Sequence, residues 1–584
     1  MRDRRRHERA FGVVESIVLA LALIITGCAG PAPSRPLVRF PSPEELDAIT
    51  SQPAPGRNEF SQSLDAGDGW QLDGPFPAVL GQTPLRSSNR WESALANMLE
   101  DYTSARLTEQ MRCVAREMGR FYLERDAMPA SGLRRFMLSS CRSTLPYVSS
   151  FPVKMEVGAQ FSEDQLLEDW RRQSLDARLA AALGRDRSVS GVWFGHKDES
   201  ALIFVVVGIP RAVVDPIRPI LAEGDSSVVI EGRVLEEAEY LSGYVNQGEY
   251  GVAECELDLA TRLPRFRLTC PLDPEDATMM VQIAMAPPDR VLSQAVIQFQ
   301  LNRTWGDVPV YQHRRFEENA TATSTTKFTN TILFYLNRIR QQVGLRPVAV
   351  AELQSRIAER AAPYYFGAAG RSELDKDTSD TIALTMLAGT KVDGVIRDGV
   401  FISTFVTPAD NAVEWLLESL ALPMGRIALL REKAEQIAVG PMMFRDPDVI
   451  AAIVTGYVFH RLSYHNDDLR LLVERLSKAR ERLGLSRPVV LGAIGGVVAE
   501  QLRRINQGEA QPSQALGVIL EAGTNAVRRP MAGYLIEAIN PNAIEIPEKI
   551  LKMTNLALTI GITHHRPEGA AWAQLVVLIA YISE

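Results

Sequence analysis

One block of sequence recurs three times along this chain, and this internal repeat limits the possible folds more than any other feature. Each copy is predicted to contain a helix that ends near an aromatic residue, a second apolar-rich helical stretch, and two strands joined by a short polar turn. The aromatic residues are Trp170, Trp415 and Tyr534, and the turns are residues 195–198, 445–448 and 564–569. Glycine, proline and aspartate in such turns are typical of strand hairpins, so each copy predicts an α+β unit.

A helical region is predicted before each block. In the second and third copies, residues 336–348 and 478–489 share a basic helix, a Gly-Leu stop and a proline. This order is typical of a helix end. In the first copy the helix is predicted from apolar residues at helical spacing, which are Leu107, Met111, Val114, Met118 and Phe121.

The stretch between the first and second copies has a different pattern. Short runs rich in β-branched residues alternate there with glycine, proline and aspartate, at 227–235, 240–245, 252–259, 265–272, 279–286 and 292–301. Such regularly spaced strands predict a small β-sandwich. The sequence therefore predicts an α+β fold, with repeated units at 88–208, 325–465 and 466–584 and an all-β, sandwich-like insert at 209–315.

The N-terminal residues have the features of an export signal. Five arginines, ending at Arg9, precede an apolar run from Ile17 to Ile25. This run is too short to cross a bilayer, which needs roughly 20 helical residues. The sequence Ile25-Thr26-Gly27-Cys28 resembles the lipobox of bacterial lipoproteins, in which the cysteine thiol receives a diacylglycerol before the signal is removed. The resemblance implies that residues 1–27 are cut off and that lipid on Cys28 anchors the protein to a membrane.

Residues 28–87 are predicted to form a tether between this anchor and the folded part. Seven prolines fall between residues 29 and 60, together with serine, glycine and few aromatic residues. This composition favours an extended chain and cannot bury a core.

The charge of the exported chain excludes some partners. Removing residues 1–27 deletes five arginines and three acidic residues, so the formal net charge moves from -8 to -10. This acidity argues against a nucleic acid or an anionic lipid surface as a partner.

The four remaining cysteines are expected to form two disulfides, because an exported protein meets an oxidising compartment. Cys255 and Cys270 lie on two predicted strands at equal distances from a turn near residue 262, which would oppose them in an antiparallel pair. Cys113 and Cys141 lie on two predicted helices that flank the breaker at 128–132. The alternatives are four free buried thiols, or metal ligation, which the absence of a CxxC spacing disfavours.

Two of the copies carry residues that resemble motifs of a known family. The residues are Leu336, Asn337, Arg340, Gly344, Leu345, Pro347 and Val348, then Trp415, Ser419, Arg426, Leu429 and Leu430, and in the first copy Trp170, Ser174 and Arg178. They are similar to the first helix and to the later Trp, Ser-Pro-x-His-Arg and leucine motifs of the CAP superfamily of cysteine-rich secretory proteins, antigen 5 and pathogenesis-related proteins. The resemblance extends over all three repeated units and implies that they are alpha-beta-alpha sandwich domains.

The chain departs from this family at the residues that bind metal. Many CAP domains hold a divalent ion with two histidines and two glutamates, and one histidine stands just before the arginine named above. This chain has Ala177 and Gly425 there in the first two copies, and no histidine between Ala538 and Leu556 in the third. Imidazole is the ligand that suits zinc, so no metal site and no cofactor are expected.

The histidines that the chain does have are expected to lie outside any catalytic site. His564 and His565 are predicted in one hairpin turn and His196 in another, where surface exposure is usual. His460 and His465 flank a strand end, where their polar neighbours are expected to cap the next helix. The aromatic residue of each repeat is expected to pack in a core. The sequence has no nucleophile elbow, Walker loop or dinucleotide motif, so no catalytic residue is assigned.

The sequence therefore predicts a cell-envelope lipoprotein anchored through Cys28. The leading hypothesis is a non-enzymatic protein whose CAP-like domains bind another envelope protein, a wall polymer or a lipid. An extracellular hydrolase with an unrecognised cleft is the alternative, and a structural spacer is the third possibility. In a Gram-negative cell, Ala29 after the cysteine favours the outer membrane, facing the periplasm or the cell surface, as the lipoprotein resemblance implies.

Overall fold

A computed structural model describes most of the chain. The described residues are 43–50, 63–64, 69–98, 106–158, 161–172, 177–185, 187–222, 224–287, 293–303, 309–312, 324–370, 395–396, 400–406, 411–445, 448–460, 462–538, 544–567 and 573–582. The predicted signal at 1–27 and Cys28 lie outside them. Within these ranges, no helix combines the length and the apolar character that crossing a membrane requires.

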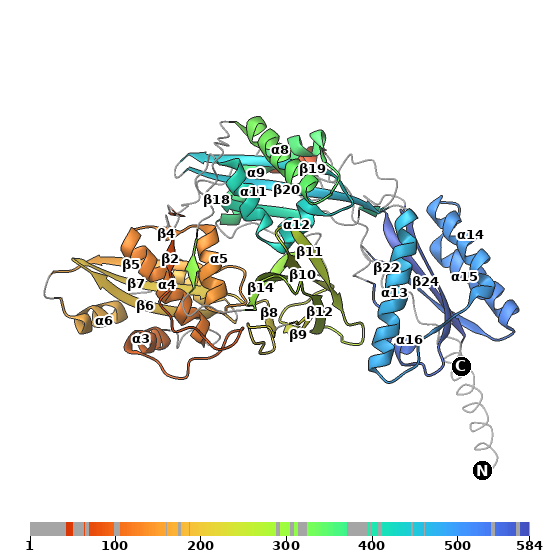
Figure 1. Cartoon of the computed structure of the whole chain (residues 1–584), viewed down its shortest axis with the longest axis horizontal. Helices are drawn as coiled ribbons and strands as arrows, with labels where there is room; N and C mark the ends of the chain where they lie inside the picture. The colour runs from red at the N-terminus through yellow and green to blue at the C-terminus, as the bar shows by residue number, and fades with distance from the viewer. Residues whose placement is uncertain are drawn as a thin grey trace, which may run out of the picture.

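The described residues form three α+β units and a β domain (Figure 1). The β domain lies between the first and third units along the long axis of the molecule (Figure 1). The second unit packs on the β domain through helix α12 (Pro423–Leu430). Mixed helices and sheets confirm the predicted α+β class.

The three units contain similar sets of elements. The first has α3 (Arg90–Met98), β3 (Arg106–Leu107), α4 (Glu109–Arg125), α5 (Ser131–Ser140), β5 (Ser149–Glu156), α6 (Glu163–Arg172), α7 (Ala177–Leu183), β6 (Val189–Lys197) and β7 (Ser200–Gly208). The second has α8 (Thr325–Gln342), β16 (Ala349–Val350), α9 (Glu352–Gly370), β17 (Val395–Ile396), β18 (Val400–Val406), α11 (Ala412–Leu420), α12, β19 (Ala434–Arg445) and β20 (Asp448–His460). The third has α13 (Leu462–Arg482), β21 (Val489–Val490), α14 (Gly495–Asn506), α15 (Pro512–Val527), β22 (Met531–Ala538), α16 (Glu548–Lys552), β23 (Ala557–His565) and β24 (Gln574–Ile582).

All three sheets share one topology. The orders are β3-β6-β7-β5, then β16-β19-β20 with β17 and β18 both on β20, and β21-β23-β24-β22. In each sheet a two-residue strand pairs in parallel with the first strand of a hairpin, and the second strand of the hairpin pairs with an antiparallel edge strand. The predicted hairpins are therefore confirmed as β6–β7, β19–β20 and β23–β24.

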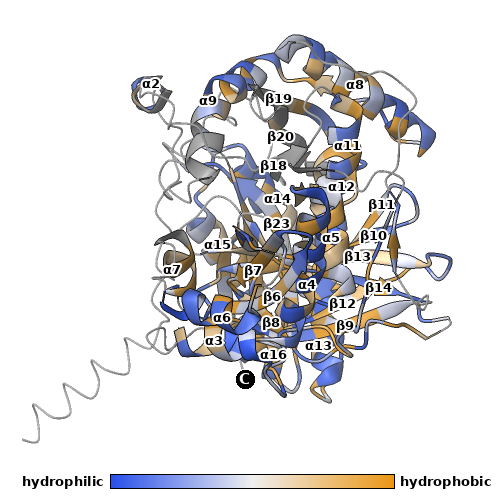
Figure 2. Ribbon diagram, turned by 90° about the vertical axis from the view of Figure 1, so that its left-hand side faces the viewer, coloured by the Kyte–Doolittle hydropathy of each residue, from blue (hydrophilic) through white to orange (hydrophobic). Residues whose placement is uncertain are grey.

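Helices cover both faces of these sheets. In the third unit, α13 and α16 pack on one face with Ile560 and Ile562, and α14 and α15 pack on the other with Val576 and Leu578. The first unit has α4 and α5 on one face and α3, α6 and α7 on the other. Figure 2 shows the polar outer helix α6 largely in blue and the buried strand β7 in orange. Each sheet is thus the middle layer of a three-layer unit.

Local sequence explains where several helices begin and end. The side chains of Thr108 and Ser324 accept hydrogen bonds from backbone N–H groups in the first turns of α4 and α8. Gly344 and Gly484 follow α8 and α13, and each has a φ of 74°. Because this left-handed conformation favours glycine, the predicted Gly-Leu stops are confirmed in both units.

Glycines in the hairpin strands let a helix approach the sheet. A Cβ on Gly440 of β19 would lie 2.3 Å from the backbone carbon of Ala358 in α9. A Cβ on Gly561 of β23 would lie 2.9 Å from the side chain of Val498 in α14. The two glycines stand at the same register from the parallel strand pair, since Gln436 and Ala557 begin that pairing. The second and third units therefore share this helix-to-sheet contact.

The helix predicted around Met111 is confirmed, but its match to the helices of the other copies is wrong, and the helix predicted at 533–538 is also wrong. The helix that contains Met111 and Phe121 is α4, which packs on β6 and β7 as α9 packs on β19 and β20. The counterpart of α8 and α13 is therefore α3. The segment 533–538, predicted as a helix, is strand β22, because its backbone pairs with β24 from Met531 to Ala538.

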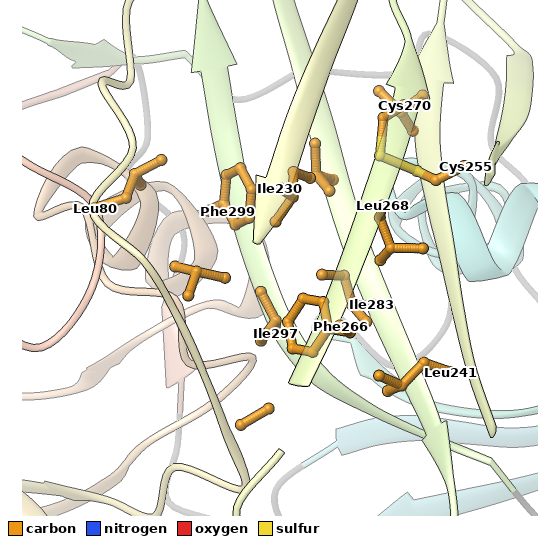
Figure 3. Close-up of a cluster of buried hydrophobic side chains, with 14 of the residues drawn as sticks. Leu80, Ile230, Leu241, Cys255, Phe266, Leu268, Cys270, Ile283, Ile297 and Phe299 are labelled. Atoms are coloured by element: carbon orange, nitrogen blue, oxygen red, sulfur yellow. A yellow bond between two sulfur atoms is a disulfide. The ribbon is translucent and has the colours of Figure 1, made fainter. Parts of the chain in front are cut away.

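The β domain is one antiparallel sheet of seven strands that curls around a core. Its strands are β8 (Ala212–Val214), β9 (Ser227–Val234), β10 (Tyr240–Gln247), β11 (Gly251–Leu257), β12 (Arg265–Pro271), β13 (Thr278–Ala286) and β14 (Gln294–Asn302), in the order β14-β13-β10-β11-β12-β9-β8. The end strands β14 and β8 contact each other. Phe266, Ile283, Ile297 and Phe299 fill the interior (Figure 3).

The predicted tether and insert are both too long. Trp70 and Leu72 are buried in the core of the first unit, and Leu80 is buried in the β domain (Figure 3). Strand β2 (Trp70–Gln71) pairs with β15 (Val310–Tyr311), so residues 310–311 of the predicted insert lie with the first unit. The apolar residues after position 69 are what the proline-based prediction overlooked, because burying them stabilises an ordered chain.

Candidate functional site

The family resemblance directs attention first to Gly425, which stands where many CAP domains carry a metal-binding histidine. Gly425 lies in the first turn of α12 and is buried. A Cβ on Gly425 would lie 1.8 Å from the carbonyl oxygen of Ser419. No side chain, and so no histidine, fits at this position without moving the backbone of α11 or α12.

The next residue, Arg426, holds α12 against the β domain. Its Nη1 donates to the carbonyl oxygens of Gly251, at 2.6 Å, and Gly248, at 3.2 Å. Its Nε donates to the carbonyl oxygen of Leu420 at 2.8 Å. Burial lowers the pKa of Arg426 to about 10, so the guanidinium remains charged at neutral pH. Arg426, the arginine of the family motif, therefore forms part of the interface between the second unit and the β domain.

Two amide side chains of the β domain also form hydrogen bonds across this interface. Asn246 Nδ2 donates to the carbonyl oxygen of Ala421 at 2.9 Å. Gln282 Oε1 accepts from the backbone N–H of Met424 at 3.0 Å, which satisfies one of the unpaired donors at the start of α12. The β domain thus covers the segment in which the family carries its metal-binding histidine.

The corresponding short helices of the other units also lack a histidine. Ala177 is the first residue of α7, and its side chain lies outside the described residues. In the third unit the helix before the hairpin is α16, where Glu548 and Lys552 form an ion pair. Neither helix provides an imidazole ligand.

The prediction that His564 and His565 lie in a surface turn is wrong. Both belong to strand β23, where they pair with Leu575 and Gln574, and both are buried. His465 lies near the start of α13 and is also buried. The ring centroids of His465 and His564 are 5.3 Å apart. Strand alternation could have revealed this burial, because His564 shares a face with Ile560 and Ile562.

These histidines do not assemble a metal or catalytic cluster in the described ranges. No group of three or more histidine, cysteine or acidic residues that could hold a metal ion occurs there. His565 lies on the opposite face of the sheet from His564, and burial lowers its pKa below the ordinary value while nearby Glu537 opposes that shift. His196 is exposed beside its hairpin turn, and the side chain of His460 lies outside the described residues.

The aromatic residue of each repeat has a packing role. Trp170 and Trp415 are buried in the cores of the first and second units, as predicted. Tyr534 is in strand β22 and stacks on Tyr581, with ring centroids 5.8 Å apart.

Both predicted disulfides are confirmed. Cys255 and Cys270 are joined across β11 and β12 with Cα atoms 4.1 Å apart, and the neighbouring pair Glu256 and Thr269 shows that the two cysteines are directly opposed. Cys113 of α4 and Cys141 at the end of α5 are joined with Cα atoms 5.5 Å apart.

Strand β11 and Asp258, the residue that follows it, carry a row of acidic residues that the sequence analysis missed. Ion pairs join Arg431 to Glu254, Lys478 to Glu256 at 2.9 Å, and Arg482 to Asp258 at 2.7 Å. Arg431 belongs to the second unit, and the other two basic residues belong to α13 of the third. The alternation of Glu254, Cys255 and Glu256 was the available signal, since it places both carboxylates on the face opposite the disulfide.

These observations define an α+β protein with a repeated three-layer unit, an inserted β domain and two disulfides. No family model matches the chain. A solved structure of a cysteine-rich secretory protein from Staphylococcus aureus subsp. aureus Mu50 is 13% identical, with a TM-score of 0.17, and covers 48% of this chain and 91% of that one.

One curated relative also matches part of the chain. The methionine import ATP-binding protein MetN of Latilactobacillus sakei subsp. sakei (strain 23K) is 29% identical over 180 residues, which is 28% of this chain. The chain spans about half the length of that relative, 49%. The Walker sequence G-x-x-x-x-G-K-[ST], which cradles nucleotide phosphates, does not occur in this chain.

Proposed function

We propose that this chain is a lipoprotein of the bacterial cell envelope, anchored through Cys28, whose CAP-like units bind an envelope component without chemical turnover. The component would be another envelope protein, a wall polymer or a lipid. Two disulfides in separate domains support an extracytoplasmic location, because disulfides persist in oxidising compartments.

The contact between Gly425 and Ser419 carries the non-enzymatic part of the proposal. In the unit that resembles the family best, the histidine position has no room for a side chain. Arg426 is occupied by carbonyl oxygens of the β domain. A family-type metal site in this unit would require both features to change.

Binding to purified envelope fractions tests the proposal directly. Mature lipidated protein is mixed separately with wall polymer, total envelope lipid and solubilised envelope proteins, and bound material is quantified as a function of concentration. We expect saturable binding to one fraction and no release of soluble cleavage products. Saturable binding to none of the three would contradict the proposal. The variant Cys28→Ser, which lacks the anchor, separates binding by the folded domains from co-fractionation through lipid.

The hydrolase alternative has one observation in its favour, the contact between the buried rings of His465 and His564. Histidine is the commonest general base in hydrolytic sites. Release of soluble fragments from wall polymer or lipid that is abolished in His564→Gln, but retained in His196→Gln, would favour the hydrolase over the binding protein.

A further inference from the structure

A hollow of about 560 Å³ lies where the first unit meets the β domain. The first unit contributes Arg187, which precedes β6, and the β domain contributes Arg233 at the end of β9. Arg187 extends across the interface between the first unit and the β domain, and its Nη1 donates to the carbonyl oxygen of Leu235. The guanidinium group of Arg187 is therefore held at Leu235, two residues after Arg233 in the chain.

A third arginine stands beside this hollow. Arg233 of β9 and Arg265 of β12 are directly opposed in the antiparallel register, so their side chains share the outer face of the sheet. Both are exposed, and in the described part of the chain neither forms an ion pair. Like charges in directly opposed positions are destabilising, so an anion between these two residues would stabilise the pair.

The next pair on the same face of these two strands combines opposite charges. Arg267 of β12 faces Glu231 of β9, and the two form an ion pair. In the pair at the hollow, an arginine takes the place of that glutamate. A negative charge that neutralises Arg233 and Arg265 therefore has to come from outside β9 and β12.

Two acidic residues, Glu236 and Glu237, line the hollow, but neither forms an ion pair with Arg233 or Arg265 in the described part of the chain. Glu236 is bound by Arg211, whose Nε lies 2.8 Å from Glu236 Oε2. Glu237 follows it on the same rim and is exposed. An acidic rim beside three arginines admits a small anion but repels an extended polyanion or an anionic surface.

We propose that this hollow binds the phosphate group of a small soluble ligand between Arg187, Arg233 and Arg265. A phosphomonoester carries about -1.5 to -2 charges at neutral pH, which suits several guanidinium groups better than the single charge of a carboxylate. Guanidinium forks also form paired hydrogen bonds with phosphate oxygens. The site combines Arg187 of the first unit with two arginines of the β domain, so it is separate from the Gly425 segment of the second unit, and it does not depend on the anchor at Cys28.

Calorimetric titration of the full mature chain with inorganic phosphate tests this site. We expect saturable binding of one phosphate per chain, weakened by about tenfold or more in Arg233→Gln and in Arg265→Gln because each loses charge-assisted hydrogen bonds. Arg233→Lys should give a smaller loss, since lysine keeps the charge without the fork. The matched control is Arg267→Gln, which removes the same charge from the same strand face but from an existing ion pair.

Three outcomes would overturn the proposal. The first is no saturable binding to the wild type at millimolar phosphate. The second is an equal loss in Arg267→Gln, which would indicate the general field of the surface. The third comes from sedimentation of unanchored Cys28→Ser protein with phosphatidylglycerol and phosphatidylcholine vesicles. Vesicle binding that requires Arg233, without binding of free phosphate, would assign the arginines to a lipid surface. Melting curves verify that each variant is folded.

Discussion

Arg340 and Arg480 occupy the same place in two units and bind equivalent acceptors. Both side chains are fully buried. Arg340 Nε donates to the carbonyl oxygen six residues later, at 2.7 Å, and Arg480 Nε does the same at 2.9 Å. Their Nη1 atoms donate to carbonyl oxygens in the short helix before the hairpin, at 2.7 Å to Leu429 and 3.0 Å to Leu551. Burial lowers the pKa of both arginines, and backbone carbonyl oxygens replace the water that each charge has lost.

Arg480→Met should destabilise the third unit by at least about 3 kcal/mol, because several buried carbonyl oxygens would lose their donors. Hydrogen exchange of α13 and α16, combined with denaturant unfolding, would measure the change. Arg480→Lys should also destabilise, since one ammonium cannot reach all of these acceptors. Arg503→Met is the control, because Arg503 is exposed in a surface ion pair and should change stability by less than about 1 kcal/mol. Equal effects at positions 480 and 503 would contradict the structural role of Arg480.

Gly425→Ala should destabilise the joint between the second unit and the β domain by about 2 kcal/mol or more, because the added Cβ would overlap the Ser419 carbonyl oxygen. Gly425→His should cost at least as much and should not create zinc binding. Denaturant unfolding measures the first effect and calorimetry the second.

The matched control for this substitution is Gly517→Ala. Gly517 lies within helix α15, and a Cβ there would meet nothing within 4 Å. This variant should be stabilised by about 0.5 to 1 kcal/mol, as expected for alanine in a helix interior. A stable Gly425→Ala variant would show that α12 adjusts easily and would remove the main support for a closed site.

Features that depend on local sequence could be predicted. The stops at Gly344 and Gly484 require only a left-handed residue after a helix. The Cys255–Cys270 disulfide follows from the symmetry of two short strands about one turn. Contacts between distant segments could not be predicted in this way. The pairing of Trp70 with Tyr311 is an example, because two-residue strands carry almost no periodicity.

The candidate site shows the same limit. The sequence identified Gly425 as the wrong residue for a metal ligand, and this follows from residue type alone. It gave no indication that Arg426 binds backbone carbonyl oxygens of the β domain, since no local pattern encodes that contact. The histidine turn was mispredicted because His564 and His565 extend a strand whose partner, β24, determines its length.

His565 should make the protein less stable in mild acid. Its folded-state pKa lies below the ordinary value because of burial, so the unfolded chain binds the proton more readily. The stability that the neutral imidazole provides is complete above about pH 6.5, the unfolded value, and is lost as pH falls through the folded pKa. The melting temperature should therefore fall between pH 7.5 and 5.5, and by less in His565→Gln. The exposed His196→Gln should keep the wild-type slope, and an unchanged slope in His565→Gln would show that other groups cause the loss.

Cys28→Ser should abolish lipid attachment and move the protein out of the membrane fraction. The reason is chemical, because the serine hydroxyl does not replace the thiol in the thioether bond to diacylglycerol. Metabolic labelling with a fatty acid, followed by fractionation, measures both effects. Ala29→Ser is the control, since it leaves the cysteine in place and should remain labelled. Unchanged label in Cys28→Ser would refute the lipoprotein proposal.

Zinc should not bind tightly to the metal-free, lipid-free protein. A stable zinc site needs three or four positioned ligands, and the described ranges bring together His465 and His564 without a third residue of the required type. Calorimetric titration should show no stoichiometric binding below micromolar concentrations. A chelator should also leave the melting temperature unchanged, because a metal that bound only the folded state would raise it. His564→Gln distinguishes the remaining outcomes. Submicromolar zinc affinity that disappears in this variant, but persists in His196→Gln, would place a metal site in the third unit and move the hydrolase to first place.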